Sequence, residues 1–164
     1  MIKINKDFLN KEQFNELKNI ITSDLFPWFY QNKMTKTKKN NEKPYFSHIF
    51  YKDYSPNSSF YYIAENCLKH LNVKSLISIR ANLNLILDKK YYSNWHTDQS
   101  FKCKTSLFYI NDNNGYTEIK DDNNKLIKIY CKENSMITFD SYHSHRLVSQ
   151  TNTEKRIAIN FNYF

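Results

Sequence analysis

The hydrophobic period of the chain changes near residue 75, and this change limits the possible folds more than any other feature of the sequence. From Ser75 to Leu87, apolar and polar residues alternate. A period of two is typical of β-strands. Further strand candidates follow, separated by turn sequences such as N-D-N-N-G: Tyr92–Asp98, Thr105–Asn111, Tyr116–Lys120, Leu126–Tyr130, Ser135–Asp140, His145–Ser149 and Arg156–Phe164. The second part of the chain therefore predicts eight short strands.

Two amphipathic helices precede these strands. Asn10 can cap the first helix, and Phe14, Leu17 and Ile21 follow it at helical spacing. A second helix with one apolar stripe is predicted over residues 57–71. Helices followed by short antiparallel strands predict an α+β fold, a jelly roll with the N-terminal helices packed on its larger sheet. We expect one domain over residues 1–164, with residues 1–74 as helical support and residues 75–164 as the barrel.

Charge and cysteine content argue against several classes of protein. The net charge is +8, but the densest basic run, Lys33–Lys43, has neither interleaved aromatic residues nor apolar periodicity. This favours a solvated loop over a nucleic-acid surface, so nucleic acid is the less favoured partner. The three cysteines form no C-x-x-C pair, which argues against a zinc site or a disulfide framework. Without an apolar run long enough to span a bilayer, we expect a cytoplasmic protein (host cytoplasm for a viral chain) that has no membrane partner.

A histidine and a carboxylate two residues apart form part of a candidate metal site. On a strand, the side chains of His96 and Asp98 would point to one face and could reach the same ion. A second imidazole would come from another strand, where His143 and His145 are the two candidates. They lie two residues apart, so alternation along a strand would place both on the same face and does not decide between them. Two histidines and one carboxylate on one side of a metal leave positions open for other ligands, which is the pattern of non-haem Fe(II) oxygenases.

The last predicted strand begins with an arginine on its polar face. An arginine that points into a barrel is costly unless it meets an anion, and its planar fork suits a carboxylate. Arg156 lies eleven positions beyond His145. The 5-carboxylate of 2-oxoglutarate is a fitting partner, because the other end of that molecule chelates iron.

The chain from residue 75 onward resembles 2-oxoglutarate-dependent oxygenases of the prolyl-hydroxylase type, and it is similar to small phage-encoded members. The resemblance rests on the distal histidine, on the segment R-I-A-I-N-F-N-Y-F that begins at Arg156, and on T-S-L-F-Y-I-N at 105–111. It implies that the jelly roll is a double-stranded β-helix. It also implies that His145, rather than His143, binds the metal.

The same resemblance assigns further residues to the co-substrate. Tyr109 would contact 2-oxoglutarate through its hydroxyl group, and Asn160 would help to hold the carboxylate that binds to Arg156. The tyrosine that the family usually carries on the first barrel strand is replaced here by Asn82 and Asn84. Of these two residues, Asn84 is expected to contact 2-oxoglutarate.

The implied activity is hydroxylation that depends on Fe(II), 2-oxoglutarate and O₂. The favoured primary substrate is a peptide, including a peptidyl proline, or a small molecule; nucleic acid and a non-catalytic metal-binding jelly roll are the alternatives. The expected substrate contacts are Arg80, Tyr92, Trp95 and Asn162. For Arg80, a structural salt bridge is the competing expectation. Loops at Lys33–Tyr54 and Tyr91–Trp95 are expected to surround the mouth of the barrel and to select the substrate.

Overall fold

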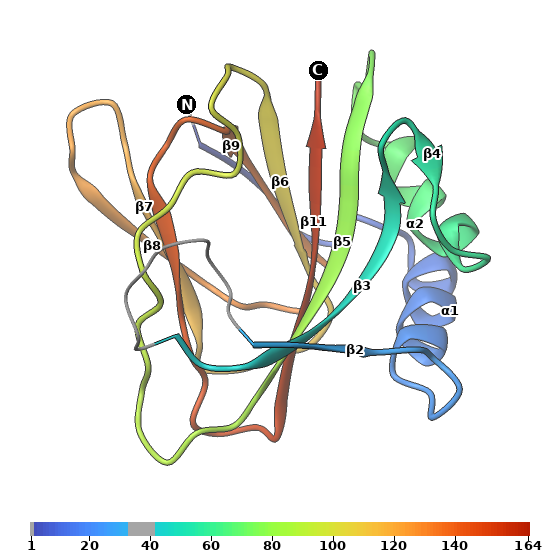
Figure 1. Ribbon diagram of the computed structural model, residues 1–164, viewed down its shortest axis with the longest axis horizontal. Coiled ribbons are helices and arrows are strands. Elements are labelled where there is room, and N and C mark those ends of the chain that lie inside the picture. The colour runs from blue at the N-terminus through green and yellow to red at the C-terminus, as the bar shows by residue number, and fades with distance from the viewer. Residues whose placement is uncertain (1, 33–41) are drawn as a thin grey trace.

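The computed structural model describes residues 2–32 and 42–164, which form two helices and two β-sheets (Figure 1). The helices are α1 (Lys11–Ile21) and α2 (Tyr61–Leu68). The larger sheet contains β1 (Lys3–Asn5), β2 (Phe29–Gln31), β3 (Tyr45–Lys52), β4 (Ser55–Pro56), β5 (Leu76–Leu85), β6 (Lys104–Tyr109), β9 (Ser135–Asp140) and β11 (Lys155–Tyr163), in the order β1-β9-β6-β11-β5-β3-β2 with β4 beside β3. The smaller sheet contains β7 (Tyr116–Lys120), β8 (Leu126–Tyr130) and β10 (His145–Val148), in the order β10-β7-β8. The predicted jelly roll is confirmed.

The centre of the larger sheet is the antiparallel pair of β5 and β11. Arg156 pairs with Asn84 and Asn160 pairs with Arg80, so the two strands run side by side for most of their length. One face of the pair is apolar and buried: Ile79, Ala81, Leu83, Ile157, Ile159 and Phe161. The opposite face carries polar side chains and is turned toward the smaller sheet. Because side chains alternate along a strand, the sequence pattern places an apolar face outside and a polar face inside the barrel.

The two helices cover the apolar outer face of the larger sheet (Figure 1). Phe14 of α1 and Cys67 of α2 belong to the same buried cluster as Ile159 of β11. The ring of Phe14 meets the ring of Phe108 on β6 edge to face, with 6.0 Å between their centroids. No helix of residues 2–32 and 42–164 is long and apolar enough to cross a bilayer.

Local hydrogen bonds explain where α1 begins and why α2 is short. Asn10 caps α1 as expected, since its side-chain oxygen accepts a hydrogen bond of 2.9 Å from the backbone N–H of Gln13. The second helix is shorter than the predicted 57–71. The amide of Asn57 donates to the carbonyl groups of Lys52 and Ser55, and this closes a turn before the helix. At its other end, the N–H of Leu71 bonds to a carbonyl three residues back, so residues 69–71 form a tighter turn.

One predicted strand is wrong. The segment Tyr92–Asp98 makes only isolated bridges to β10, at Tyr92 and at His96. Regular pairing fails because side chains replace backbone partners: the N–H of Leu147 donates to the hydroxyl of Ser93 instead of a carbonyl group. The other predicted strands are present, with ends that differ by at most two residues from those expected.

The prediction of a loop over Lys33–Tyr54 is also wrong in part. Residues 45–52 form β3, which pairs with β5 and extends the larger sheet beyond the barrel. The aromatic, alternating sequence Y-F-S-H-I-F-Y carries the strand signal. The basic run Lys33–Lys43 lies almost wholly outside the described residues.

A second apolar cluster lies between the two sheets. Tyr109, Ile119, Ile137 and Phe139 are its fully buried members. Phe139 contacts His145 and Tyr109 contacts Arg156, so the cluster packs beneath both ends of the polar pocket.

The contact between α1 and the larger sheet predicts a stability effect. Phe14→Ala removes a side chain that is only 5% exposed, and Leu25→Ala alters one that is 88% exposed. We expect Phe14→Ala to lower the free energy of unfolding by about 3–5 kcal/mol, because it leaves a cavity. Leu25→Ala should change it by less than about 0.5 kcal/mol. Urea denaturation followed by circular dichroism measures both, and equal effects would contradict this packing.

Candidate functional site

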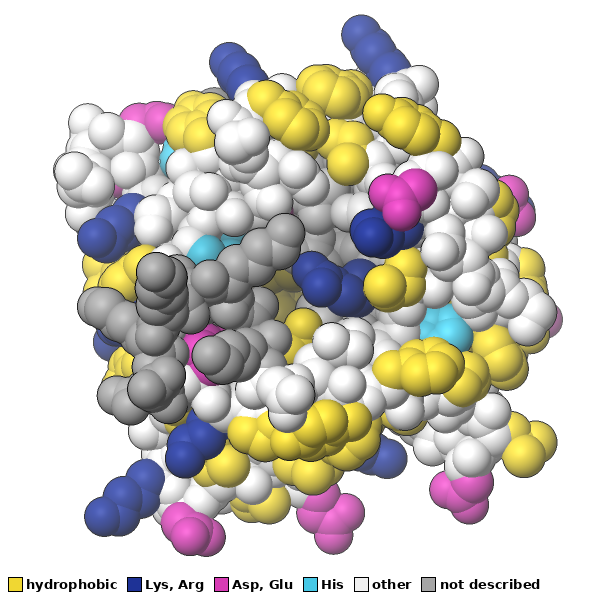
Figure 2. Space-filling view, viewed as in Figure 1, with side chains coloured by type: hydrophobic (Ala, Val, Ile, Leu, Met, Phe, Trp, Pro, Cys, Tyr) yellow, Lys and Arg dark blue, Asp and Glu magenta, His cyan; other side chains and the backbone are white. Residues whose placement is uncertain are grey.

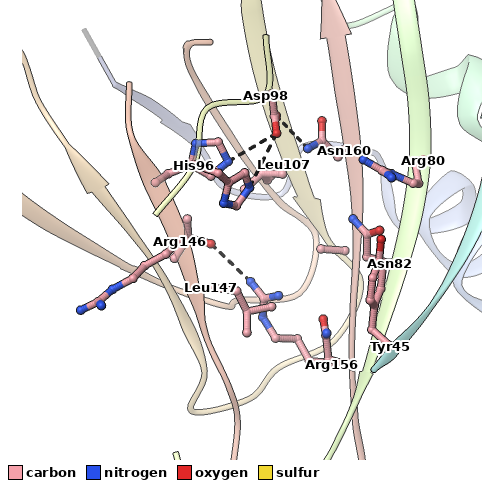
Figure 3. A pocket seen from close by; sticks show the side chains of 14 residues that line it. Tyr45, Arg80, Asn82, His96, Asp98, Leu107, Arg146, Leu147, Arg156 and Asn160 are labelled. Carbon is pink, nitrogen blue, oxygen red and sulfur yellow. Dashed lines mark hydrogen bonds and ion pairs between the residues drawn. The ribbon is translucent and has the colours of Figure 1, made fainter. Parts of the chain in front are cut away.

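A polar pocket lies between the two sheets (Figure 3). The strands β5 and β11 supply one wall, β7 and β10 supply the facing wall, and the segment before β6 brings two more side chains to it. His96, Asp98 and His145 lie together on this pocket, and Arg156 lines another part of it. The candidate metal ligands and the candidate anion-binding arginine therefore share one cavity.

His96, Asp98 and His145 form a group that could hold a metal ion. Their ligand atoms all lie within 4.8 Å of one another. The Oδ1 atom of Asp98 is 3.9 Å from Nε2 of His96 and 3.6 Å from Nε2 of His145. His96 and Asp98 come from the irregular segment before β6, and His145 is the first residue of β10. His96 and Asp98 were expected to lie close together on a strand. In the structure a loop brings them together, and backbone hydrogen bonds join this loop to β10.

Backbone hydrogen bonds hold the two rings in place. The N–H of His96 donates to the carbonyl of His145 and the reverse bond is also made, at 3.1 and 2.9 Å. The Nδ1 atom of His96 is 3.1 Å from the carbonyl oxygen of Asn94, and Nδ1 of His145 is 3.1 Å from that of His143. A carbonyl oxygen can only accept, so each Nδ1 carries the proton. In the neutral form of either ring, Nε2 would therefore carry the lone pair, which is the tautomer that a metal requires.

Asp98 is oriented through its other oxygen. Its Oδ2 accepts a hydrogen bond of 2.9 Å from the amide of Asn160 on β11. The hydroxyl of Thr105 on β6 lies 3.1 Å from the same oxygen. Asn160 is itself held, because its Oδ1 accepts from the amide of Asn162 at 2.9 Å. These bonds leave Oδ1 of Asp98 directed at the two imidazoles (Figure 3).

The local electrostatics favour an ionised carboxylate. Burial alone would raise the pKa of Asp98, but the contacts with His145, Asn160 and His96 outweigh burial and hold that pKa far below its usual range. Burial and the nearby His145 lower the pKa of His96. For His145, burial lowers the pKa, but Asp98 outweighs it and the net shift is upward. An ionised carboxylate next to the imidazole of His96, whose pKa is lowered, matches the donors that a divalent metal needs, and His145 would bind the metal in its neutral form.

The structure separates the two later histidines. The Nε2 atom of His143 is 3.0 Å from a carboxylate oxygen of Asp122, in the turn between β7 and β8. It is therefore directed away from the group that contains Asp98. His145 alone of this pair is placed to join His96 and Asp98.

Arg156 is buried, with an exposed fraction of 4%, and its partners are uncharged. Its Nε donates to the sulfur of Cys131 at 2.9 Å, and one terminal nitrogen donates to the hydroxyl of Thr117 at 3.3 Å. Burial raises the pKa of Cys131, which keeps the thiol neutral although Arg156 acts against it. Among residues 2–32 and 42–164, no carboxylate forms an ion pair with Arg156. A buried guanidinium without a counter-ion is a strong site for an anion.

Asn84 lies opposite Arg156 and lines the same pocket. Its side-chain oxygen is buried and has no hydrogen-bond partner among the described residues. Amide oxygen and nitrogen positions can be exchanged by a flip of the group, so this amide can accept from or donate to a ligand. Asn82, two residues earlier, also lines the pocket.

Tyr109 lies under Arg156 and is fully buried. Its hydroxyl is 2.8 Å from that of Thr117, and the guanidinium carbon of Arg156 is 5.6 Å from its ring centroid. Burial raises the pKa of Tyr109, so its hydroxyl stays protonated. Thr117, which sequence reasoning missed, connects the two residues and lines the pocket itself. Its place next to β10 in the smaller sheet could have been found only from strand pairing.

The structure places the four expected substrate contacts in different surroundings. Arg80 lines the pocket. Tyr92 and Trp95 instead pack against the guanidinium of Arg146, at 4.8 and 4.5 Å from its carbon, and that guanidinium points away from the pocket (Figure 3). The side-chain amide of Asn162 donates a hydrogen bond to Oδ1 of Asn160. Tyr45, which sequence reasoning missed, reaches the pocket from β3.

The fold has well-matched counterparts among solved structures. A 2OG-Fe(II) oxygenase family oxidoreductase from Burkholderia pseudomallei has a TM-score of 0.71 at 9% identity, over 99% of this chain and 84% of that one. A prolyl-4-hydroxylase from Pseudomonas putida has a TM-score of 0.68 at 9% identity, over 99% and 91% of the two chains. A prolyl hydroxylase from Trichoplax adhaerens, in complex with a hypoxia inducible factor peptide fragment, has a TM-score of 0.68 at 16% identity, over 99% and 83%. The sequence itself matches no protein-family model and no curated protein.

The geometry predicts different effects for the two later histidines. We expect His145→Ala to weaken Co(II) binding by more than about 100-fold, since losing a ligand should exceed the loss of an outer hydrogen bond. His143→Ala should weaken it by less than about 10-fold, because His145 bonds to the backbone carbonyl of residue 143 rather than to its ring. Isothermal titration calorimetry with Co(II) measures both affinities. Equal losses in the two variants would contradict the assignment of His145 as a ligand.

Proposed function

We propose that the chain is a dioxygenase that uses Fe(II) and 2-oxoglutarate to hydroxylate its substrate. The observation that carries the proposal is one pocket with two features: a His-Asp-His group and a buried arginine that has no acidic partner among the described residues. A metal site alone would fit many functions. A metal site beside a buried cationic position suits a co-substrate that has one chelating end and one carboxylate end.

The three side chains fit Fe(II). Two imidazole nitrogens and one carboxylate oxygen make up the donor set that non-haem Fe(II) oxygenases use, and three protein ligands leave positions for other molecules. His96 and His145 would bind through Nε2, and Asp98 would bind through Oδ1. Bound iron supplies O₂ activation, such that the substrate C–H bond, 2-oxoglutarate and O₂ become C–OH, succinate and CO₂.

Arg156 would bind the 5-carboxylate of 2-oxoglutarate. Its position beside Thr117 leaves the buried fork with neutral partners, so an incoming carboxylate would provide its missing counter-charge. The unpartnered amide of Asn84 offers one more hydrogen bond on the opposite strand. Leu107 and Leu147 line the pocket and suit the two methylene groups of the co-substrate. Tyr109 would hold Arg156 and Thr117 in place from below.

The primary substrate is proposed to be a peptide or a small molecule. One structural neighbour is a prolyl hydroxylase in complex with a peptide, and this supports a peptidyl, including prolyl, substrate for this chain. The pocket also opens beside a solvent-exposed arginine, a feature that bears on the chemistry of the substrate.

Anaerobic titration of Fe(II) and 2-oxoglutarate into the apo-protein tests the proposal. We expect the visible charge-transfer band of a chelated 2-oxo acid in the wild type, and succinate release once O₂ is admitted. Arg156→Lys keeps the charge but loses the bidentate fork, so it should raise the Kd of 2-oxoglutarate by about 10- to 100-fold. Co(II) affinity should stay within about threefold of wild type, because Arg156 does not contact the three ligands.

Lys155→Gln is the matched control, since it removes an exposed positive charge one residue away. It should leave the Kd of 2-oxoglutarate within about twofold, as expected of a solvated surface charge. Absence of the band in the wild type would overturn the oxygenase proposal. If the wild type forms the band but releases no succinate with each of the amino acids and peptides tested, the result would support the non-catalytic metal-binding alternative.

A further inference from the structure

A second arginine lines the pocket, and the proposed reaction leaves it unused. Arg80 lies on β5 with its side chain on the inner face of the sheet, opposite Asn160. Figure 3 shows its guanidinium extending toward Asn160, on the side of the pocket where Asp98 lies. Unlike Arg156, it is exposed to solvent. Figure 2 shows Lys and Arg side chains near the middle of this face, beside a hollow.

Arg80 has no acidic partner. No ion pair or hydrogen bond joins its side chain to another residue of 2–32 or 42–164, so the structural salt bridge considered from the sequence is absent there. Residues 1 and 33–41 contain no aspartate or glutamate. An arginine in the same pocket as the candidate metal ligands is therefore left without a neutralising carboxylate among residues 2–32 and 42–164.

The co-substrate does not provide a counter-charge for Arg80. One carboxylate of 2-oxoglutarate goes to Arg156 and the other goes to the metal, according to the proposed function on which this inference rests. The two positive charges of iron and the charge of Arg156 are balanced by Asp98 and by the two carboxylates. The loaded site would be neutral without Arg80, so Arg80 adds an uncompensated positive charge on the solvent side.

The position of Arg80 separates it from the carboxylate clamp. Arg156 pairs with Asn84, whereas Arg80 pairs with Asn160, and these positions are four residues apart on each strand. At about 3.4 Å per residue, the two backbone positions lie about 14 Å apart along the sheet. Asn160 also bonds directly to Asp98, which places Arg80 at the metal end of the pocket. A group bound to Arg80 would therefore belong to a molecule that approaches the metal from solvent.

We propose that the primary substrate carries a carboxylate, that Arg80 binds it, and that this contact places the reacting C–H bond beside the metal. Arginine presents a planar fork that matches a carboxylate in two parallel hydrogen bonds. Asn82, on the same strand face, lines the pocket and adds an amide for a neighbouring polar group of the substrate. The carboxylate belongs either to a free carboxylic acid, such as an amino acid, or to an acidic side chain of a peptide.

A polynucleotide fits this pocket less well. Binding to a phosphate backbone relies on several cations, each neutralising one phosphate. Three arginines line the pocket: Arg80, Arg146 and Arg156. Arg146 donates to Glu118 at 2.7 Å, and Arg156 is buried. Among the described lining residues, Arg80 is the single cation that is exposed and without an acidic partner, which matches one carboxylate.

Paired acid and amide probes test this proposal on the holoenzyme. The probes are free L-amino acids with their carboxamides, and capped peptides with glutamate or glutamine next to proline. The readouts are perturbation of the Fe(II)–2-oxoglutarate band under anaerobic conditions and succinate release in air. We expect at least one acid to bind about 10- to 100-fold more tightly than its amide, the usual range for a hydrogen bond to a charged group. The free acids and the peptides distinguish the two sources of the carboxylate.

Variants of Arg80 link the preference to this residue. Arg80→Gln should abolish the preference for the acid, and Arg80→Lys should retain part of it, because the charge remains while the fork is lost. Lys125→Gln, an exposed lysine in the turn before β8, should keep the wild-type preference. The Kd of 2-oxoglutarate should stay within about twofold in Arg80→Gln, because Arg156 holds that carboxylate.

Each failure has a distinct meaning. If the wild type forms the charge-transfer band but no acid is preferred over its amide, the carboxylate proposal is wrong and the oxygenase proposal stands. If Arg80→Gln weakens 2-oxoglutarate as strongly as Arg156→Lys does, Arg80 belongs to the co-substrate site and the proposal is also wrong. If the wild type forms no band, the proposed function itself fails.

Discussion

The pairing of β5 with β11 is the constraint on which the rest of the structure depends. Both strands are central in the larger sheet, so both of their faces must be covered. The helices bury one face with ordinary apolar packing. The other face carries the buried side chains of Asn84, Arg156 and Asn160, and such groups are costly inside a barrel unless each has a partner. The fold therefore requires polar partners in the same place where a ligand pocket lies.

The protein supplies these partners at one end of the pocket and leaves them incomplete at the other. Near the metal ligands, Asn162, Asn160 and Thr105 form a connected set of hydrogen bonds that ends on Asp98. This set fixes one carboxylate oxygen and leaves the other for a metal. At the opposite end, Arg156 has only neutral partners. A buried cation that the protein does not neutralise is tolerable when a bound anion completes it, so under the proposed function co-substrate binding would also stabilise the fold.

Sequence periodicity was enough to predict the jelly roll and the polar face of its central strands, because both depend on local alternation. It was not enough for the segment Tyr92–Asp98. That segment has the composition of a strand, but the hydroxyl of Ser93 takes the place of a backbone acceptor, and no local pattern reveals this. Strand β3 was missed for a different reason: its alternating aromatic sequence carries a strand signal, but these residues were assigned to a loop at the mouth of the barrel. Thr117 and Tyr45 enter the pocket only through strand pairing.

Burial, rather than residue type, separates the proposed roles of Arg80 and Arg156. Arg156 is enclosed by neutral partners, so under the proposed function it would bind the same small anion, 2-oxoglutarate, at the start of each reaction cycle. Arg80 is open to solvent, where water screens its charge until a substrate displaces that water. An exposed guanidinium costs the folded state little when no ligand is bound, and its interaction with a carboxylate becomes stronger when the ligand displaces water from it. The same residue type on the same sheet can thus serve a constant co-substrate at the buried end and a selected substrate at the open one.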